Sequence, residues 1–219
     1  MKNLLQFRLA DERVQFLVST DRKLARLITC IGDADLEIEN DDFRCIVKYI
    51  IGQQISDRAR ETIWQRLCDS CEDLTPIGIS NLPDDVLQHV GISGQKVEYI
   101  KNLARAISEK EIEFEKFKDC SNREIIDTLI TVRGIGRWTA EMYIIFSLGR
   151  INVLAKGDGT IRRSIQWMYN LENVPNTKEL MNYFNKWEGY ETIVSAYFWK
   201  SIALGLQTTA FDNITCKGR

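Results

Sequence analysis

The sequence lacks several features by which classes of protein are recognised. Its formal net charge is only −2 over 219 residues, which argues against binding to nucleic acid through bulk positive charge. It contains no apolar run of membrane-spanning length, no signal peptide and no low-complexity tail. We therefore expect an intracellular protein with no membrane partner. A local basic face remains compatible with this composition.

Residues that bind transition metals are also sparse. The chain has one histidine, His89, and six cysteines scattered along its length. Cys68 and Cys71 form the only pair at metal-binding spacing, and no second pair or nearby histidine completes a site. We interpret the cysteines as structural or free thiols and expect no metal site.

The sequence does contain enough apolar residues for a sizeable core. Hydrophobic residues make up 44% of the chain, prolines number only three, and the length allows one or two domains. Apolar residues recur at helical spacing in most segments, as with Leu24, Leu27 and Ile28 between a predicted N-cap at Asp21 and a stop at Gly32. The pattern indicates an all-α fold.

Serine residues mark further helix starts. Ser56 is followed by Asp57, whose charge suits the first turn of a helix. Ser93 precedes a segment with apolar residues on one side, and Ser121 or Asn122 is expected to cap the helix that leads to residue 130.

Residues 129–163 are the most informative stretch. A helical pattern ends at Gly134-Ile135-Gly136, and an almost wholly apolar helix follows from Trp138. Glycine permits positive φ and close backbone approach, so the free N–H groups of the turn and of the next helix can form an anion site. Arg133 and Arg137 flank the glycines. For Gly-x-Gly alone, an ordinary turn between antiparallel helices is the alternative.

Charge and one acid favour the anion site. Residues 133–163 contain six Lys or Arg against two acids, a local net charge of +4. One of these acids, Asp158, follows the hairpin after a single helix and is bracketed by glycines and cations. Taken alone, Asp158 would be interpreted as the N-cap of the helix that Gly159 opens.

With these parts in this order, the stretch resembles the helix-hairpin-helix DNA glycosylase superfamily. The family carries a hairpin of the form L-x-x-[LV]-x-G-[IV]-G-x-[KW]-T-A, then a Gly/Pro-rich loop with an essential Asp. The sequence G-I-G-R-W-T-A at residues 134–140 is similar to the alkylpurine branch, that of 3-methyladenine DNA glycosylase II. The motif is long and its parts are correctly spaced.

Two more segments before the hairpin resemble the family. Residues 50–56 resemble the loop that enters the minor groove, where one side chain fills the gap left by the extruded base. Gln54 matches that position, and its amide could hydrogen-bond the orphaned base. Residues 91–96 resemble the segment in which Ser93 would cap a long helix and Lys96 would meet a phosphate. A solvated polar loop and a solvated lysine are the alternatives.

The last similar block is residues 187–199, although it departs from the family pattern. Gly189 replaces the usual Pro, Glu191 replaces the usual Arg, and Trp199 falls on the closing Trp. Some alkylpurine glycosylases have a β-rich N-terminal domain, for which too little sequence precedes Asp42. The resemblance covers about residues 20 to 205.

The resemblance implies a catalytic role for Asp158, as a carboxylate that stabilises the oxocarbenium-like sugar. Trp138 stands where bifunctional relatives have a Schiff-base lysine, which implies hydrolysis by water without strand cleavage. Trp138 and Trp199 would wall a pocket for a cationic purine, with core packing as the alternative. Met142 occupies a position where some relatives carry an aromatic residue, so it would also contact the base.

The resemblance also implies the DNA contacts and the cofactors. The residues expected to contact DNA are Gln53, Gln54, Ser56, Ser93, Lys96, Arg133, Gly134, Gly136, Arg137, Thr139 and Arg162. Some members hold an iron–sulfur cluster with four cysteines near the C-terminus, where this chain has only Cys216. No iron–sulfur cluster or other cofactor is expected, while a monovalent cation at the hairpin stays open.

The sequence thus predicts the all-α, two-lobed helix-hairpin-helix glycosylase fold. Residues 41–150 form the lobe with the hairpin, and residues 1–40 with 151–219 form the second lobe, which carries Asp158. The expected function is that of a monofunctional DNA glycosylase, an N-glycosyl hydrolase of base excision repair. It would flip and excise alkylated purines, such as 3-methyladenine and 7-methylguanine, from damaged double-stranded DNA. We expect a monomer in the cytoplasm or nucleoid, or in the nucleus of a eukaryote.

Three alternatives remain at this point. The first is a glycosylase of the same fold for deaminated or mismatched bases. The second is a non-catalytic helix-hairpin-helix DNA-binding module, against which Asp158 argues, because such a module needs no buried carboxylate. The third is a helical interaction protein that never meets DNA, against which the local positive charge of residues 133–163 argues.

Overall fold

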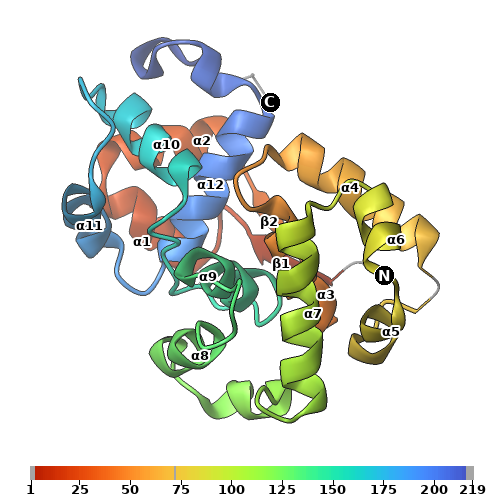
Figure 1. Ribbon diagram of the computed structural model, residues 1–219. Coiled ribbons are helices and arrows are strands. Elements are labelled where there is room, and N and C mark those ends of the chain that lie inside the picture. The colour runs from red at the N-terminus through yellow and green to blue at the C-terminus, as the bar shows by residue number, and fades with distance from the viewer. Residues whose placement is uncertain (1–2, 72, 216–219) are drawn as a thin grey trace. The chain divides into compact units, whose positions relative to one another are not determined.

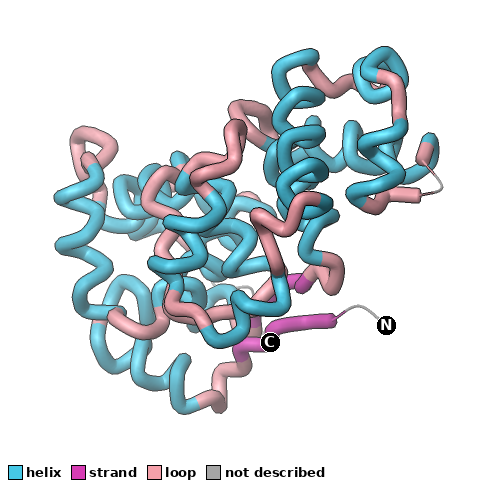
Figure 2. Tube along the Cα trace, turned by 60° about the horizontal axis from the view of Figure 1, so that its bottom comes forward, coloured by secondary structure: helices cyan, strands magenta, loops and turns pink. Residues whose placement is uncertain are grey.

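The structure, a computed structural model, describes residues 3–71 and 73–215. The chain divides into two compact units, which are treated separately below. Unit 1 comprises residues 1–38 and 149–219, and unit 2 comprises residues 39–148. Among the described residues helices predominate, and two short strands, β1 and β2, pair with each other (Figures 1 and 2). The predicted all-α class is confirmed.

Unit 2 is built from helices around α3 and α9. Its elements are α3 (Asp42–Gly52), α4 (Asp57–Ser70), α5 (Pro76–Asn81), α6 (Asp84–His89), α7 (Gly94–Ser108), the 3-10 helix η1 (Phe114–Asp119), α8 (Asn122–Leu129) and α9 (Arg137–Phe146). Helix α3 packs against α4, α7 and α9. Helix α9 is buried along most of its length, because it is apolar on nearly every side.

The helix starts predicted from serines in unit 2 are confirmed. The Ser56 hydroxyl accepts from the Ala59 N–H, and the Ser93 hydroxyl accepts from the Lys96 N–H. Ser121 caps α8 and forms a capping box with Glu124. These local signals fix where α4, α7 and α8 begin.

Unit 1 contains a two-stranded sheet that the sequence analysis did not anticipate. Strand β1 (Asn3–Phe7) pairs antiparallel with β2 (Ala34–Ile38). Its helices are α1 (Glu12–Thr20), α2 (Arg22–Ile31), α10 (Gly159–Tyr169), α11 (Thr177–Phe184) and α12 (Glu191–Ala203), with 3-10 helices η2 (Asn185–Trp187), η3 (Leu206–Thr208) and η4 (Phe211–Asn213). Helix α12 is central, because it packs against α2, α10 and β2.

The predicted limits of helix α2 are confirmed. The Asp21 side chain accepts hydrogen bonds from the backbone N–H groups of Lys23 and Leu24. Gly32 ends the helix with φ of +77°. The preceding helix α1 was not predicted.

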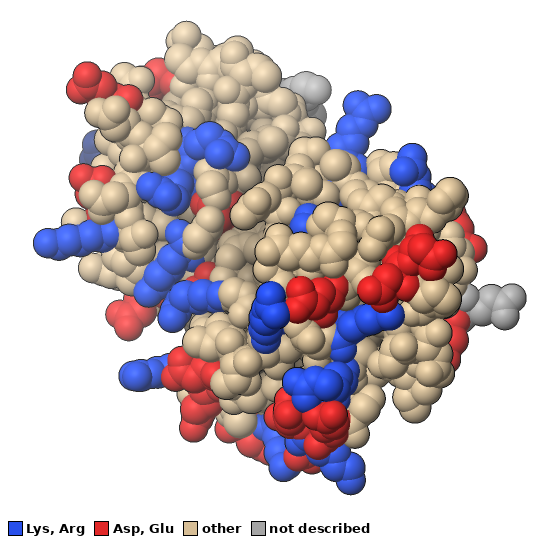
Figure 3. All heavy atoms as spheres, viewed as in Figure 1, with Lys and Arg blue, Asp and Glu red and all other residues tan. Residues whose placement is uncertain are grey.

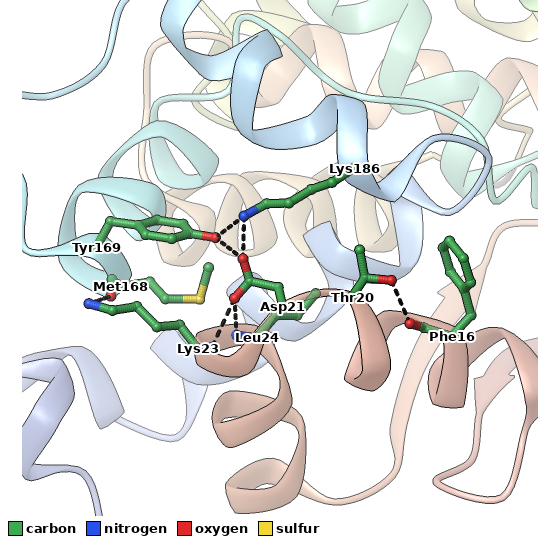
Figure 4. A network of polar contacts seen from close by, with 8 residues as sticks. All are labelled: Phe16, Thr20, Asp21, Lys23, Leu24, Met168, Tyr169 and Lys186. Atoms are coloured by element: carbon green, nitrogen blue, oxygen red, sulfur yellow. Dashed lines mark hydrogen bonds and ion pairs between the residues drawn. The ribbon is translucent and has the colours of Figure 1, made fainter.

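Asp21 also joins three elements of unit 1 (Figure 4). Its Oδ2 atom accepts hydrogen bonds from Lys186 Nζ, in η2, and from the Tyr169 hydroxyl at the end of α10. Burial alone would raise the pKa of Asp21, but the hydrogen bonds from Lys186, Tyr169 and the Leu24 N–H, together with the positive charge of Lys186, hold the pKa below its usual value.

Replacing Asp21 should therefore destabilise the protein in a pH-dependent way. Asp21→Asn keeps a capping side chain but loses the charge that Lys186 neutralises, so we expect a loss of about 2 kcal/mol at pH 7. Because the folded-state pKa lies below the unfolded one, this contribution is complete above the unfolded pKa and disappears as the pH falls through the folded pKa. Urea unfolding across the pH range measures it.

Asp127→Asn is the matched control, since Asp127 and Arg123 form an exposed ion pair at 3.5 Å. It should change the free energy of unfolding by no more than a few tenths of a kcal/mol. If Asp21→Asn costs the same at neutral pH and well below about pH 4, the charge contributes nothing and the pKa assignment is wrong.

Candidate functional site

The hairpin between α8 and α9 uses its two glycines differently. Gly134 has φ of +104°, and a Cβ atom there would lie 2.2 Å from Cγ of Tyr99. Gly136 has φ of −88° and ψ of 169°, an ordinary extended conformation. A Cβ atom on Gly136 would have no neighbour within 4 Å. Gly134 is therefore required by the fold, whereas Gly136 borders open space.

The open space lies at the N-terminus of α9. Gly136 is the N-cap of this 10-residue helix, and it supplies no side chain to cap it. The first backbone hydrogen bond of the helix is donated by the Ala140 N–H to the Gly136 oxygen. The preceding N–H groups, of Arg137, Trp138 and Thr139, thus have no acceptor within the helix. Such a helix end carries partial positive charge and suits a phosphate.

Both arginines that flank the hairpin are exposed and already paired with acids. Arg133 forms an ion pair with Glu98, with 2.7 Å between Nη1 and Oε1. Arg137 donates from Nε to Oε1 of Glu141 at 2.9 Å, and Glu141 is buried. Lys and Arg side chains lie interspersed with Asp and Glu on the face drawn in Figure 3. A phosphate contact by either arginine stays a prediction.

The loop after α3 meets the hairpin through Gln53. The Gln53 amide nitrogen donates to the Gly134 carbonyl oxygen at 2.9 Å and to the Thr139 hydroxyl at 3.0 Å. Thr139 is only 1% exposed. The side chains of Gln53 and Thr139 therefore contact each other, and the DNA contacts expected of both residues stay a prediction.

Gln54, the next residue of the loop, is exposed. Its φ of +59° lies in the left-handed region, which is uncommon for a residue other than glycine. Ile55, which the sequence analysis passed over, is also exposed at 38%. The feature of the sequence that could have identified Ile55 as a candidate is an apolar residue within a polar loop. The Ser56 hydroxyl is occupied by its capping bond to Ala59.

The Lys96 side chain donates hydrogen bonds to backbone oxygens of unit 2. Its Nζ atom donates to the carbonyl oxygens of Ile51 and Gln53, at 2.7 Å each, so it caps the C-terminal end of α3. Burial lowers the pKa of Lys96. Ser93 likewise uses its hydroxyl to cap α7. The phosphate contact expected of Lys96 and the DNA contact expected of Ser93 stay predictions.

Two predicted pocket residues lie on α9. Trp138 is half-buried and meets the ring of Tyr49 edge-on, with 5.9 Å between ring centroids. Met142 is 2% exposed and belongs to the core of unit 2. Trp138 thus keeps some exposed surface for a ligand, while a base contact by Met142 stays a prediction.

Asp158 caps helix α10 in unit 1, as the sequence indicated. Its Oδ1 atom accepts from the N–H groups of Thr160 at 2.7 Å and Ile161 at 3.1 Å. Asp158 is 8% exposed, and its other oxygen, Oδ2, makes no hydrogen bond with the residues that the structure describes. The cap therefore fixes the carboxylate through one oxygen and leaves the second unengaged.

Thr192 holds the segment that leads to Asp158. Its hydroxyl lies 2.9 Å from the Arg150 carbonyl oxygen and 3.1 Å from that of Val153, either of which can accept its single hydrogen, and its oxygen accepts from the Val153 N–H. The Thr192 N–H donates to the Ile151 oxygen at 2.9 Å. The first turn of α12 thereby positions the approach to Asp158. This role of Thr192 was not predicted from the sequence, because the contact joins residues about forty positions apart.

The remaining predicted residues of unit 1 lie on α10 and α12. Arg162 is half-buried and donates from Nε to the Pro175 oxygen at 2.8 Å. Trp199 is half-buried on α12. Burial raises the pKa of Glu191, which stands where the family has an arginine. The DNA contact of Arg162 and the pocket role of Trp199 stay predictions.

Within residues 3–71 and 73–215, no cluster of three or more His, Cys, Asp or Glu side chains could hold a metal ion. Cys68 and Cys71 are free thiols. Cys216, on which the iron–sulfur prediction partly rests, lies outside the described residues. No described helix is both long and apolar enough to cross a membrane.

The fold and the hairpin match proteins of base excision DNA repair. Residues 47–188 match the HhH-GPD superfamily of base excision DNA repair proteins. The chain is 30% identical over 194 residues to the alkylbase DNA glycosidase-like protein mag2 of Schizosaccharomyces pombe, covering 84% of this chain and 90% of that protein. The chain therefore belongs to the HhH-GPD superfamily.

Solved structures agree with this membership. The DNA-3-methyladenine glycosidase from Bacillus halodurans superposes with a TM-score of 0.80 at 27% identity, covering 95% of this chain and 97% of that one. The Schizosaccharomyces pombe 3-methyladenine DNA glycosylase Mag1, in complex with abasic DNA, gives a TM-score of 0.84 at 24% identity, covering 91% and 100%. At that identity, the second likeness supports the fold alone.

Proposed function

We propose that this protein is a monofunctional DNA glycosylase that excises alkylated purines, such as 3-methyladenine and 7-methylguanine, from double-stranded DNA. The observation that carries the proposal is Asp158, held at the N-terminus of α10 through Oδ1 with Oδ2 unengaged, in a member of the HhH-GPD superfamily. The names of the relatives support the substrate class, since they include an alkylbase glycosidase-like protein and a DNA-3-methyladenine glycosidase.

Asp158 would act on the sugar. As the N-glycosidic bond breaks, the base leaves with the bonding electron pair and the sugar becomes oxocarbenium-like. The carboxylate stabilises this cation, and its fixed orientation requires no reorganisation during the reaction. Water then adds its oxygen to the anomeric carbon and loses a proton, which leaves an abasic site. An alkylated cationic purine is already a good leaving group, so no general acid is needed.

Trp138 and Trp199 would bind the flipped base. An aromatic face attracts a cation by about 0.5–2 kcal/mol, which favours positively charged purines over normal ones. Trp138 is held by Tyr49 and remains half-exposed. Gln54, exposed on its loop, would fill the gap in the duplex and hydrogen-bond the orphaned base.

The open N-terminus of α9 would hold a DNA phosphate. A monovalent cation at the hairpin would find oxygen ligands in the carbonyl groups of Val132, Arg133 and Gly134, each of which accepts one hydrogen bond and keeps a second lone pair. Such an ion would add positive charge, and no chemical step depends on it.

We further propose that the protein acts as a monomer where the DNA of the cell lies, in the nucleoid or nucleus.

The product should be an intact strand that carries an abasic site. Trp138 occupies the position of the Schiff-base lysine of bifunctional relatives, and an indole cannot form an imine with the sugar. Borohydride added during turnover should therefore trap no covalent complex with DNA, and denaturing gels should show strand breaks only after alkali. Efficient trapping would contradict this prediction and make Lys156, two residues before Asp158, the candidate nucleophile.

A panel of duplexes tests the proposed substrate class. Each duplex carries one 3-methyladenine, 7-methylguanine, hypoxanthine or mismatched uracil, and the released base is measured under single-turnover conditions. We expect the alkylated purines to be released fastest. Preferred release of hypoxanthine or uracil would support the glycosylase for deaminated or mismatched bases instead. Tight binding with no release from any duplex would support the non-catalytic DNA-binding module.

A further inference from the structure

We propose that Gln53 is a positioning residue that locks the loop carrying Gln54 to the hairpin, so that both DNA-contacting segments of unit 2 engage the duplex as one rigid element. This inference rests on the proposed function, which assigns DNA contacts to the loop and to the hairpin. It adds a role for the Gln53 side chain, which points to the protein itself.

The Gln53 side chain contacts residues on both sides of Gly136, the N-cap of α9. Its amide nitrogen donates one hydrogen bond to the Gly134 oxygen in the turn and the other to the Thr139 hydroxyl in the first turn of α9. These acceptors lie 81 and 86 residues away in the chain, on either side of the N-cap Gly136. A carbonyl oxygen can only accept, so the nitrogen of the amide must face it and both donors are used.

Helix α7 braces the same two segments from a second side. Lys96 binds the carbonyl oxygen of Gln53 at 2.7 Å and so fixes the loop backbone. Tyr99 fills the space beside Gly134, and Asn102 donates from Nδ2 to the Arg133 oxygen at 3.3 Å. Loop, hairpin and α7 therefore form one connected set of contacts within unit 2.

This bracing explains how Gln54 keeps its backbone conformation. A non-glycine residue at φ of +59° persists only when its surroundings hold it. With Gln53 fixed on the hairpin, the spacing between Gln54 and the N-terminus of α9 is set before DNA arrives. A phosphate at the hairpin and a side chain in the base gap can then bind together, without an ordering cost at the moment of binding.

A double-mutant cycle on Gln53 and Thr139 tests the proposal. Gln53→Leu removes both donors, and Thr139→Val removes one acceptor at nearly constant volume. The probe is a duplex with a tetrahydrofuran abasic analogue opposite 2-aminopurine. We expect about 10-fold weaker binding for Gln53→Leu and about 3-fold weaker binding for Thr139→Val. The double variant should bind no more weakly than Gln53→Leu, because both changes break the same hydrogen bond.

The fluorescence of 2-aminopurine separates positioning from general destabilisation. At saturating protein, measured by anisotropy, Gln53→Leu should bind through the hairpin yet lose most of the wild-type change in 2-aminopurine emission. Gln65→Leu is the matched control, since Gln65 makes a single exposed hydrogen bond to Asp69 on α4. It should leave affinity and emission unchanged.

Wild-type affinity and emission for Gln53→Leu would overturn the proposal, as would independent, multiplying effects of the two substitutions. If Gln53→Leu fails to fold, Thr139→Val becomes the deciding variant, because it retains the hydrogen bond from Gln53 to Gly134. A reduced change in 2-aminopurine emission for Thr139→Val would then support the proposal, and a wild-type change would overturn it. The abasic duplex has no base to release, so these outcomes do not depend on catalysis. Failure of base release by the wild type would instead overturn the proposed function.

Discussion

Asp158→Asn is expected to slow base release by about 10³-fold or more, while stability and DNA affinity stay close to wild type. Asparagine is as good an N-cap as aspartate, so its side-chain oxygen can still accept from the Thr160 and Ile161 N–H groups. What disappears is the negative charge beside the developing oxocarbenium ion. The substitution therefore separates the capping role of Asp158 from its proposed catalytic role.

Single-turnover base release, affinity for an abasic duplex and urea unfolding measure the three quantities separately. Asp158→Ala is the companion variant, since it removes cap and charge together and should also cost about 1 kcal/mol of stability. Near-wild-type turnover by Asp158→Asn would contradict the assignment of Asp158 as the catalytic residue.

The two hairpin glycines should respond in opposite ways to substitution. Gly134→Ala should cost about 3 kcal/mol or more in the free energy of unfolding, because strain at positive φ adds to the clash with the Tyr99 ring. Gly136→Val should leave stability within about 0.5 kcal/mol, since its backbone is extended and no atom lies near the new side chain.

Gly136→Val should nevertheless weaken DNA binding by about 10-fold, equally for all sequences, because it covers the N–H groups proposed to hold a phosphate. Loss of one phosphate contact should also reduce the slope of log affinity against log salt by about 0.9. Unfolding curves and salt titrations with an abasic duplex check both variants. Unchanged affinity and slope for Gly136→Val would make the hairpin a structural turn and place the DNA elsewhere.

The features that the sequence predicted well are local ones. Asp21, Ser56, Ser93, Ser121 and Asp158 all cap helices as expected, because capping depends on side chains and N–H groups two or three residues apart. Gly134 also adopts the positive φ that a tight turn allows. Such signals depend only on residues that lie close together in the sequence.

The partners of polar side chains could not be predicted in the same way. Gln53, Lys96 and Thr139 look like surface residues in sequence, yet each contacts an atom of unit 2 more than forty positions away. Their environment is set by how α3, α7 and α9 pack, which helical periodicity does not specify. Strands β1 and β2 were missed for a related reason. Each has only five residues, and pairing joins Asn3 to Ile38 across two helices.

Release of free bases from methylated duplex DNA tests the proposed function most directly. DNA treated with dimethyl sulfate is incubated with the wild-type protein, and the released bases are separated and identified by mass. We predict time-dependent release of 3-methyladenine and 7-methylguanine, with strands that stay intact until alkali is added. If no methylated purine is released above the level seen without protein, the chain is not an alkylpurine glycosylase.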